Sequence, residues 1–358
     1  MSDEYVVILK IENEEPLIVG KQRKSGAFNI SADYIPGSTL VGAIINEIAS
    51  NSPQNAQIRG LMEQINSTPA VPLPSYNPPD DFSRFPLYYS VNVLKKRTGN
   101  EDYIFAFKGK PGYKKKRGMY FIDGNEIRII KVEKARYTHV KIDDRFASVD
   151  GSPDSNSLYQ VLAIPEKSRF YAKARIPKEI RDMLKKGIEV FIGSMRLRGY
   201  GAARVSISKE IEKDTYLQRR LAKVKPGEMV IVALSPVLVN SNAVIQLRND
   251  INVGEDLINT VANYYFSQQF SPSPFSLSLA SGMPSCTFVA YTTNMNGQPI
   301  QPKFLRLPIC HGLAAKVNSA TNVPQNIIEC LEIPAPIRVN NRIVWGMNWF
   351  ELNYPVPR

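Results

Sequence analysis

Nine residues near the middle of the chain, GSMRLRGYG, combine glycines and arginines in a pattern that suits the binding of a phosphate-bearing chain. Glycine adopts positive φ and lets a ligand approach the backbone, and guanidinium groups donate paired hydrogen bonds to phosphate. If the segment is extended, its two arginines lie on one side. A glycine-rich hairpin with surface arginines is the alternative, and we favour RNA binding by Gly193, Ser194, Arg196, Arg198, Gly199, Tyr200 and Gly201.

A second glycine-containing turn, IPGS, precedes an apolar periodic segment. Gly37 and Ser38 stand where a tight turn and a helix N-cap are needed, and Leu40, Val41 and Ile44 begin the buried face of the helix. The free N–H groups of a helix N-terminus attract anions, so a phosphate could bind there. An ordinary capped helix start has the same residues. The segment is not a Walker loop, because no GK[ST] closes it.

Positive charge is concentrated in one stretch of the chain. The formal net charge is +12, and the residues from Arg84 to Lys141 include 15 Lys and Arg against 5 Asp and Glu. A localised positive field is typical of a protein that binds a polyanion, although a solvated surface loop is the simpler explanation. We expect the stretch to contact RNA through Lys108, Lys110, Tyr113, Lys114, Lys115, Lys116 and Arg117.

Further basic and aromatic residues extend this predicted surface. The loop KQRKSG supplies three cations, and a later strand supplies an arginine and a histidine. We expect these residues, Lys21, Arg23, Lys24, Arg136 and His139, to contact RNA as well. Unpaired bases stack on aromatic rings at about 1–3 kcal/mol each, so we expect stacking on Tyr113, Tyr120 and Tyr200.

The composition argues against several other classes of protein. The sequence has no run of about 18 apolar residues, so a membrane span is not predicted. Its acidic start, MSDEYVVILK, is unlike a secretion signal. Cys286, Cys310 and Cys330 are odd in number and widely spaced, so neither a disulfide framework nor a CxxC metal pair is expected. We therefore expect a cytoplasmic protein that does not bind a membrane and needs neither a metal nor a cofactor.

The elements that must position these motifs predict an α+β fold. Apolar patterns predict strands at 6–11, 137–142, 169–176, 188–192 and 204–207, and helices starting at Ser38 and Pro177. Without the basic stretch the order is β-α-β-β-α-β, which is the ferredoxin-like (RRM-like) arrangement. We predict a ferredoxin-like domain at 1–222 with a basic, β-hairpin-like insertion at about 67–136. A second α+β domain is predicted at 223–358, with a helix near 255–267, and a degenerate ferredoxin-like repeat is one alternative for it.

Three motifs in this order resemble the RAMP superfamily of CRISPR proteins. They are IPGS-x-x-x-G after the first strand, R-x-x-H-x-x-ID from Arg136 to Asp143 followed by SLY, and the G-S-x-R-x-R-G-x-G loop. Within the superfamily the chain looks most like the Csx-ten branch, the fifth-group Cas subunit of type III-D effector complexes. Relatives in that branch carry a tyrosine and an acidic residue before IPGS, as Asp33 and Tyr34 do here.

The resemblance implies a non-catalytic RNA-binding subunit. Such a subunit binds the repeat-derived 5′ handle of the CRISPR RNA, contacts the large signalling subunit and caps a filament of backbone subunits. The IPGS turn and the glycine-rich loop would hold the handle, and the basic insertion would act as a projecting thumb. Some relatives carry a zinc-binding CxxC in the insertion, which this chain lacks. The C-terminal region also has no clear second glycine-rich loop.

Three alternatives remain open from the sequence. A CRISPR-RNA processing ribonuclease would need a histidine near residues 20–50, and the chain has only His139 and His311. A backbone subunit that cleaves target RNA would need an aspartate within 19–27, where none occurs, although Asp123, Asp143 and Asp144 are other carboxylates of the chain. A protein scaffold whose basic loop meets an acidic partner is the third, and the dependence of RNA affinity on salt would separate it from an RNA-binding protein.

Overall fold

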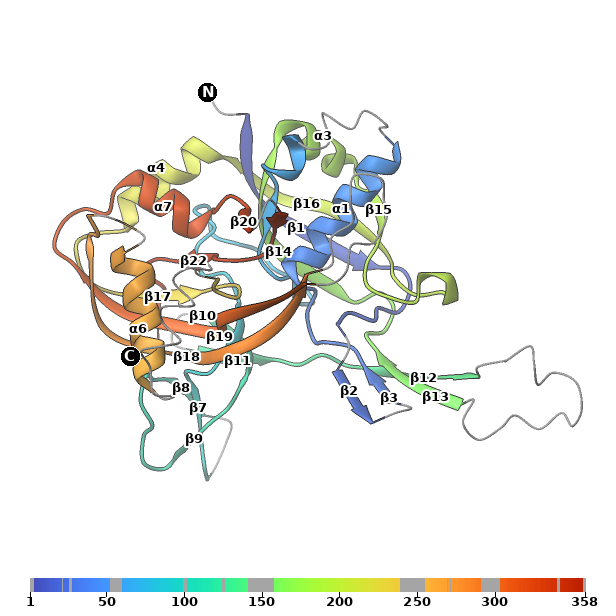
Figure 1. Cartoon of the computed structure of the whole chain (residues 1–358), viewed down its shortest axis with the longest axis horizontal. Coiled ribbons are helices and arrows are strands. Elements are labelled where there is room, and N and C mark those ends of the chain that lie inside the picture. The colour runs from blue at the N-terminus through green and yellow to red at the C-terminus, as the bar shows by residue number, and fades with distance from the viewer. Residues whose placement is uncertain are drawn as a thin grey trace, which may run out of the picture.

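The computed structural model describes residues 3–20, 22–25, 28–51, 60–98, 102–123, 126–140, 158–238, 255–268, 270, 272–290, 303–339 and 342–356. Lys21, Asp143 and Asp144 lie outside this described part. The chain is a mixture of helices and strands arranged around a central sheet (Figure 1). None of the helices in the described part is long and apolar enough to cross a membrane.

The central sheet has the order β15-β16-β1-β14-β4, with β5 also paired to β14. Its first strand lies between two antiparallel neighbours, β14 and β16. The strands are β1 (Glu4–Asn13), β4 (Asn66–Ser67), β5 (Val71–Pro72), β14 (Arg169–Pro177), β15 (Ile188–Phe191) and β16 (Ala202–Glu212).

Both faces of β1 are buried, which explains why its apolar run VVIL is continuous rather than alternating. Val7, Leu9 and Ile11 pack in one hydrophobic cluster with α1 (Gly37–Asn51) and α3 (Lys178–Lys186). Val6 and Ile8 point to the opposite face and belong to a second cluster, which includes the insertion and the C-terminal region. Figure 1 shows the sheet between these two sets of elements.

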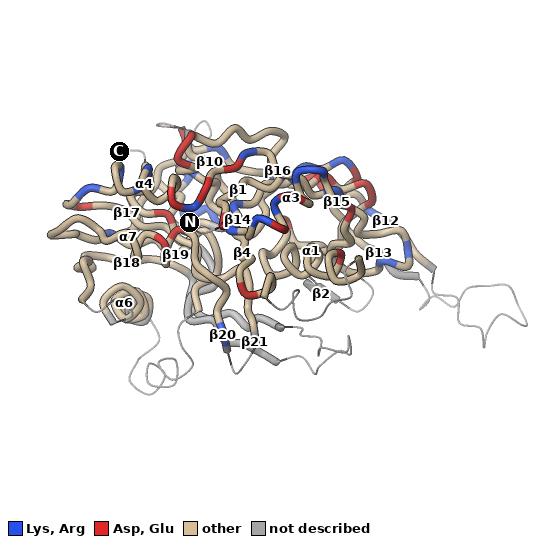
Figure 2. Tube along the Cα trace, turned by 90° about the horizontal axis from the view of Figure 1, so that it is seen from above, with Lys and Arg blue, Asp and Glu red and all other residues tan. Residues whose placement is uncertain are grey.

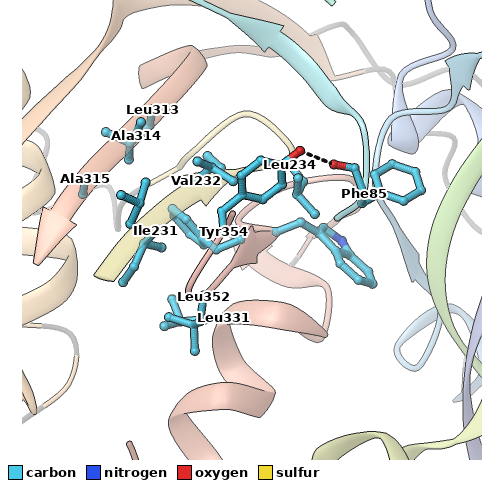
Figure 3. Packing of buried hydrophobic residues seen from close by; sticks show 14 of the residues in the cluster. Phe85, Ile231, Val232, Leu234, Leu313, Ala314, Ala315, Leu331, Leu352 and Tyr354 are labelled. Atoms are coloured by element: carbon cyan, nitrogen blue, oxygen red, sulfur yellow. Dashed lines mark hydrogen bonds between the residues drawn. The ribbon is translucent and has the colours of Figure 1, made fainter. Parts of the chain in front are cut away.

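The C-terminal region packs its own sheet against that second face. The sheet has the order β18-β19-β17-β22. Ile231 and Val232 of β17, Ala314 of β19 and Leu331 of α7 lie together in its core, where Tyr354 Oη donates a 3.0 Å hydrogen bond to the carbonyl oxygen of Phe85 (Figure 3). The elements are α4 (Lys213–Lys223), β17 (Gly227–Ala233), α6 (Glu255–Asn263), the π-helical turn η3 (Tyr264–Gln268), β18 (Phe275–Ala290), β19 (Lys303–Ser319), α7 (Gln325–Glu332), the hairpin β20 (Ile337–Val339) and β21 (Arg342–Val344), and β22 (Phe350–Glu351).

The insertion is more elaborate than the predicted hairpin, and that prediction was wrong. It forms two three-stranded sheets, β11-β10-β6 and β8-β7-β9. Buried Tyr76, Phe82, Phe85 and Tyr120 join it to the core shared with the C-terminal region, because its aromatic residues have apolar surface to bury. Its strands are β6 (Leu87–Ser90), β7 (Val93–Lys96), β8 (Tyr103–Phe105), β9 (Tyr113–Lys115), β10 (Gly118–Asp123) and β11 (Glu126–Ile130).

The strand predicted at 137–142 was placed in the wrong sheet. The structure has β12 (Ala135–Val140) in a separate sheet, β12-β13-β3-β2, with β13 (Leu158–Ala163), β3 (Phe28–Ile30) and β2 (Gln22–Ser25). The short strands β4 and β5 lie beside β14 instead, within a segment predicted as a connection. They have two residues each and are separated by Pro69, so they show no periodic pattern.

A buried ion cluster joins the three parts of the chain. Arg220 of α4 donates to both carboxylate oxygens of Glu332 at 2.6 and 2.7 Å, and to Asp81 Oδ2 at 3.2 Å. Tyr216 Oη donates to Glu332 at 2.6 Å and receives a 2.7 Å hydrogen bond from Lys173 Nζ of β14. We call these five residues the buried ion cluster. All of them are buried.

The environment of the buried ion cluster shifts the pKa values of Lys173, Asp81 and the adjacent Glu351. Burial lowers the pKa of Lys173, in opposition to the nearby carboxylates of Glu332 and Glu351. Burial also disfavours the charged form of Asp81, but hydrogen bonds from Lys223 and Ser83 outweigh it and hold its pKa at about 2. Burial raises the pKa of the adjacent Glu351 to about 7, although Arg220 and Lys173 favour its charged form.

Replacement of Arg220 by Met should lower the free energy of unfolding by about 3–5 kcal/mol, because it leaves Glu332 as an uncompensated buried charge. Chemical denaturation measures the change. Lys316→Met is the matched control, since it breaks an exposed pair with Glu228 and should cost about 1 kcal/mol or less. The double variant Arg220→Met/Glu332→Leu should recover part of the loss. Equal losses in the buried and exposed variants would contradict the prediction.

Glu351 should make stability fall as pH rises between about 4.5 and 7. In this window the folded protein keeps the Glu351 proton and the unfolded chain releases it, so unfolding becomes easier with pH. The full effect is on the order of 3 kcal/mol. Glu351→Gln should flatten this part of the curve of unfolding free energy against pH. An unchanged slope in the variant would show that Glu351 ionises normally.

Candidate nucleic-acid interface

The glycine-rich loop connects β15 to β16 and forms a short 3-10 turn, η2 (Arg196–Arg198). The Arg198 N–H donates to the carbonyl oxygen of Met195 at 2.9 Å, which closes the turn. Met195 and Gly199, at its two ends, both have left-handed backbone conformations with φ of 65° and 74°. The segment is therefore not extended, and the condition under which its two arginines would share one side is not met. Arg196 and Arg198 are nevertheless both exposed.

Two glycines of this loop fit against the chain itself rather than against a ligand. Gly193 has a φ of +88°, and a Cβ there would lie 2.2 Å from the carbonyl oxygen of Ile18. Gly201 has a φ of +104°, and its Cβ would lie 2.8 Å from the carbonyl oxygen of Ile192. The backbone of Ser194 donates to Ile18 at 3.0 Å, which fixes the base of the loop. At Gly199 a Cβ would meet nothing within 4 Å, so the backbone there is open to an approaching ligand.

Tyr200 anchors the loop to β12. It is only 2% exposed, and its hydroxyl lies 2.6 Å from Nε2 of His139. Its ring meets that of Tyr137 edge-on, with the centroids 5.7 Å apart. Burial raises the pKa of Tyr200, and the neighbouring Tyr137 adds to this effect. Stacking of Tyr200 on a base was predicted and is wrong, because the ring is already packed inside the protein. His139 and Tyr200 together position the loop.

Side chains along β12 alternate between the two faces of its sheet, so Arg136 points outward beside the glycine-rich loop. Tyr137 and His139 point toward Tyr200, and Arg136 and Thr138 are exposed. Lys134 was not among the predicted residues; its Nζ lies 2.5 Å from Asp33 and so joins the start of β12 to the segment before α1. Figure 2 shows Lys and Arg, mixed with Asp and Glu, along this end of the molecule. The backbone positions of Arg23 and Lys24 belong to β2, at the far edge of the same sheet as β12.

The IPGS turn packs against the protein itself. A Cβ on Gly37 would lie 2.3 Å from the carbonyl oxygen of Ser67 and 2.8 Å from Cα of Gly346. A Cβ on Gly346 would in turn lie 2.6 Å from the backbone nitrogen of Ser38. The predicted reason for a glycine here, close approach to a phosphate, is therefore replaced by close packing of three backbone segments. The sequence held no signal for this contact, because Gly346 is more than 300 residues from the turn.

The basic residues of the insertion form a second, separate surface on the β8-β7-β9 sheet. Figure 1 shows this sheet at the lower left, below β18, and β12 and β13 at the right. Nζ of Lys110 lies 5.4 Å from the ring centre of half-buried Tyr113, and Arg97 donates to the carbonyl oxygen of Tyr113 at 3.3 Å. The exposed basic residues are Lys96, Arg97, Lys108, Lys110, Lys114, Lys115, Lys116 and Arg117, of which the sequence analysis did not select the first two. In the sequence, Lys96 and Arg97 belong to the basic run KKR, which would have indicated them.

Tyr120 does not belong to this surface. It is fully buried, and its hydroxyl donates to the carbonyl oxygen of Lys116 at 2.6 Å. The prediction that it stacks on a base was wrong, because alternation along β10 directs its ring into the core. Among the described residues, no three His, Cys, Asp or Glu side chains gather closely enough to hold a metal ion.

Comparison with known proteins identifies the family of this chain. A family model described as the RAMP superfamily matches residues 16–204, which is more than half of the chain. No curated protein matches the sequence.

Several solved structures are similar at low identity. A chain of the type III-B Cmr-beta complex bound to cognate target RNA is 12% identical, with 86% of each chain covered and a TM-score of 0.43. A second structure of that complex, with target RNA and AMPPnP, is also 12% identical, covers 90% of this chain and 87% of the other, and has a TM-score of 0.39. Oligomeric Cmr4 from Pyrococcus furiosus is 12% identical over 58% of this chain and 99% of its own, with a TM-score of 0.28.

Removal of the Tyr200 hydroxyl should loosen the glycine-rich loop without unfolding the protein. Tyr200→Phe loses the contact with His139, and we expect a decrease of about 1 kcal/mol in unfolding free energy. Hydrogen exchange should become faster at the amides of residues 193–201. Tyr113→Phe, on the distant β9 strand, is the control and should leave these amides unchanged. Equal exchange in Tyr200→Phe and the unmodified protein would show that the hydroxyl does not hold the loop.

Proposed function

Since the chain belongs to the RAMP superfamily, we propose that it is a non-catalytic subunit of a type III CRISPR ribonucleoprotein. In this proposal it binds the 5′ repeat-derived handle of the CRISPR RNA and caps the backbone filament next to the large signalling subunit. The motif order that resembles the Csx-ten branch supports this more specific role, and partner subunits of the complex follow from it.

One observation carries the RNA-binding part of the proposal. The glycine-rich loop is anchored by hydrogen bonds with Ile18 and His139, and its 3-10 turn presents Arg196 and Arg198 to solvent. A rigid loop with outward cations binds phosphate without first losing much conformational freedom. The exposed lysines of the β8-β7-β9 sheet add a second cationic surface. A single-stranded RNA that follows both would cross from one end of the molecule to the other (Figure 1).

The sheet order also supports a ferredoxin-like reading of the N-terminal half. β1 lies between the antiparallel strands β14 and β16, β4 follows β14, and both α1 and α3 pack on one face. In this reading β15 is an additional edge strand, and the glycine-rich loop connects it to the last strand of the domain. The boundary proposed at residues 222 and 223 then separates this half from the C-terminal sheet.

The absence of catalysis is part of the proposal. In the described structure, His139 is engaged by Tyr200 and packs beside Tyr137, and this supports a positioning role. Incubation of the full-length protein with repeat-containing RNA and with a complementary target tests the point directly. Both RNAs should remain intact. Cleavage within the repeat would favour a processing ribonuclease, and cleavage of the target would favour a catalytic backbone subunit.

The RNA-binding prediction is tested by the salt dependence of affinity for single-stranded repeat RNA. The double variant Arg196→Gln/Arg198→Gln should lower the slope of log affinity against log salt by about 1.4, because each lost phosphate contact removes about 0.7. The variant Lys114→Gln/Lys115→Gln should act on the second surface in the same way.

The control for this titration changes the same amount of charge elsewhere. Lys178 and Lys225 are exposed and lie at the start of α3 and after α4. Their double change to Gln should leave the slope nearly unchanged. If all three double variants lower the slope equally, binding depends on net charge alone and the assignment of the two surfaces fails. If affinity does not depend on salt, the scaffold alternative is favoured.

A further inference from the structure

Leu197 is the most exposed large apolar side chain in the described part of the chain. Its relative exposure is 102%, and the other exposed large apolar residue there is Phe191 at 47%. Leu197 lies at the centre of the η2 turn, between the exposed residues Arg196 and Arg198. Single exposed apolar residues are common on protein surfaces, so exposure alone does not indicate a function. The structure around Leu197 provides the further evidence.

The turn that carries Leu197 is tied to the rest of the protein by contacts on both sides. Met195 on one side has left-handed backbone and packs in a small cluster with Tyr200, and the Arg198 N–H closes the turn on the carbonyl oxygen of Met195. The loop base is fixed by the hydrogen bond from Ser194 to Ile18. A non-glycine residue in left-handed conformation is uncommon and is kept only where the surroundings determine it. The protein thus holds an isobutyl group in water at a defined place.

The chemistry of the turn selects its ligand. The loop GSMRLRGYG contains cations and no acidic residue, so a polyanion is the favoured partner. An apolar tip between two cations matches single-stranded RNA, in which phosphates alternate with base faces that are free to pack. Bases inside a duplex are paired and stacked, so separating two of them costs more free energy than in a single strand. The open backbone at Gly199 leaves room for the strand to approach.

We propose that Leu197 packs against an unstacked base of single-stranded RNA and acts as a wedge between two neighbouring bases. Leucine and similar apolar side chains can enter a base step in this way and unstack it. Arg196 holds an adjacent phosphate. This inference rests on the proposed function. It adds to that function an apolar contact that recognises two separated bases, whereas the arginines recognise phosphate charge.

The test uses full-length protein and single-stranded repeat RNA with one 2-aminopurine, moved along the strand in a series of oligonucleotides. This base fluoresces more strongly when it is unstacked. We expect a rise at one or two adjacent positions. Leu197→Ala should abolish the rise and weaken binding about tenfold, because it removes most of the apolar contact. Leu197→Met should retain both. The salt slope should be unchanged in Leu197→Ala and reduced in Arg196→Gln.

Phe191→Ala is the matched control, because it removes the other exposed apolar side chain, on edge strand β15. It should leave the fluorescence and the affinity unchanged. Leu197→Ala with normal fluorescence and affinity would overturn the wedge while leaving the proposed RNA binding intact. Loss of binding to another effector subunit, with RNA affinity unchanged, would overturn it in favour of a protein contact. Failure of the unmodified protein to bind RNA would refute both the wedge and the proposed function.

Discussion

The ion pair between Arg220 and Glu332 is removed from water, so each of its charges depends on the other. Arg220 belongs to the helix after the central sheet, Glu332 to the C-terminal region, and Asp81, which also accepts from Arg220, to the insertion. Displacement of α4 or of the C-terminal region would separate Arg220 from Glu332, and displacement of the insertion would remove the contact of Arg220 with Asp81. The ion cluster thus couples all three parts, which also share one large hydrophobic cluster.

This coupling restricts where a ligand can bind. α1 and α3 cover one face of the central sheet, and the insertion and the C-terminal sheet cover the other. Neither face is open to a nucleic acid. Among the surfaces that remain are the glycine-rich loop and the β8-β7-β9 sheet, and the cations of both are exposed. The glycine-rich loop and the β8-β7-β9 sheet therefore present charge from a scaffold whose central sheet is covered on both faces.

The glycine-rich loop shows how such a scaffold makes a flexible sequence rigid. Three of its nine residues are glycines, which would give a mobile segment in isolation. Gly193 and Gly201 instead permit tight packing against the backbone of Ile18 and Ile192, and the Tyr200 ring is clamped by His139 and Tyr137. Rigidity at the base leaves only the tip, with Arg196, Leu197 and Arg198, for recognition.

The amino-acid sequence was sufficient to predict the strands and helices with strong apolar periodicity, such as β1, α1 and β14, and to identify the cations of the glycine-rich loop and the insertion. These depend on local patterns of three to eight residues. Tertiary structure alone decided which aromatic and glycine residues face a ligand. Tyr120, Tyr200 and Gly37 became part of the interior because partners hundreds of residues away, or on another strand, cover them. Lys173 shows the same effect. Alternation along β14 directs its side chain away from α1 and α3, and the packing of the C-terminal region on that face then excludes water from it.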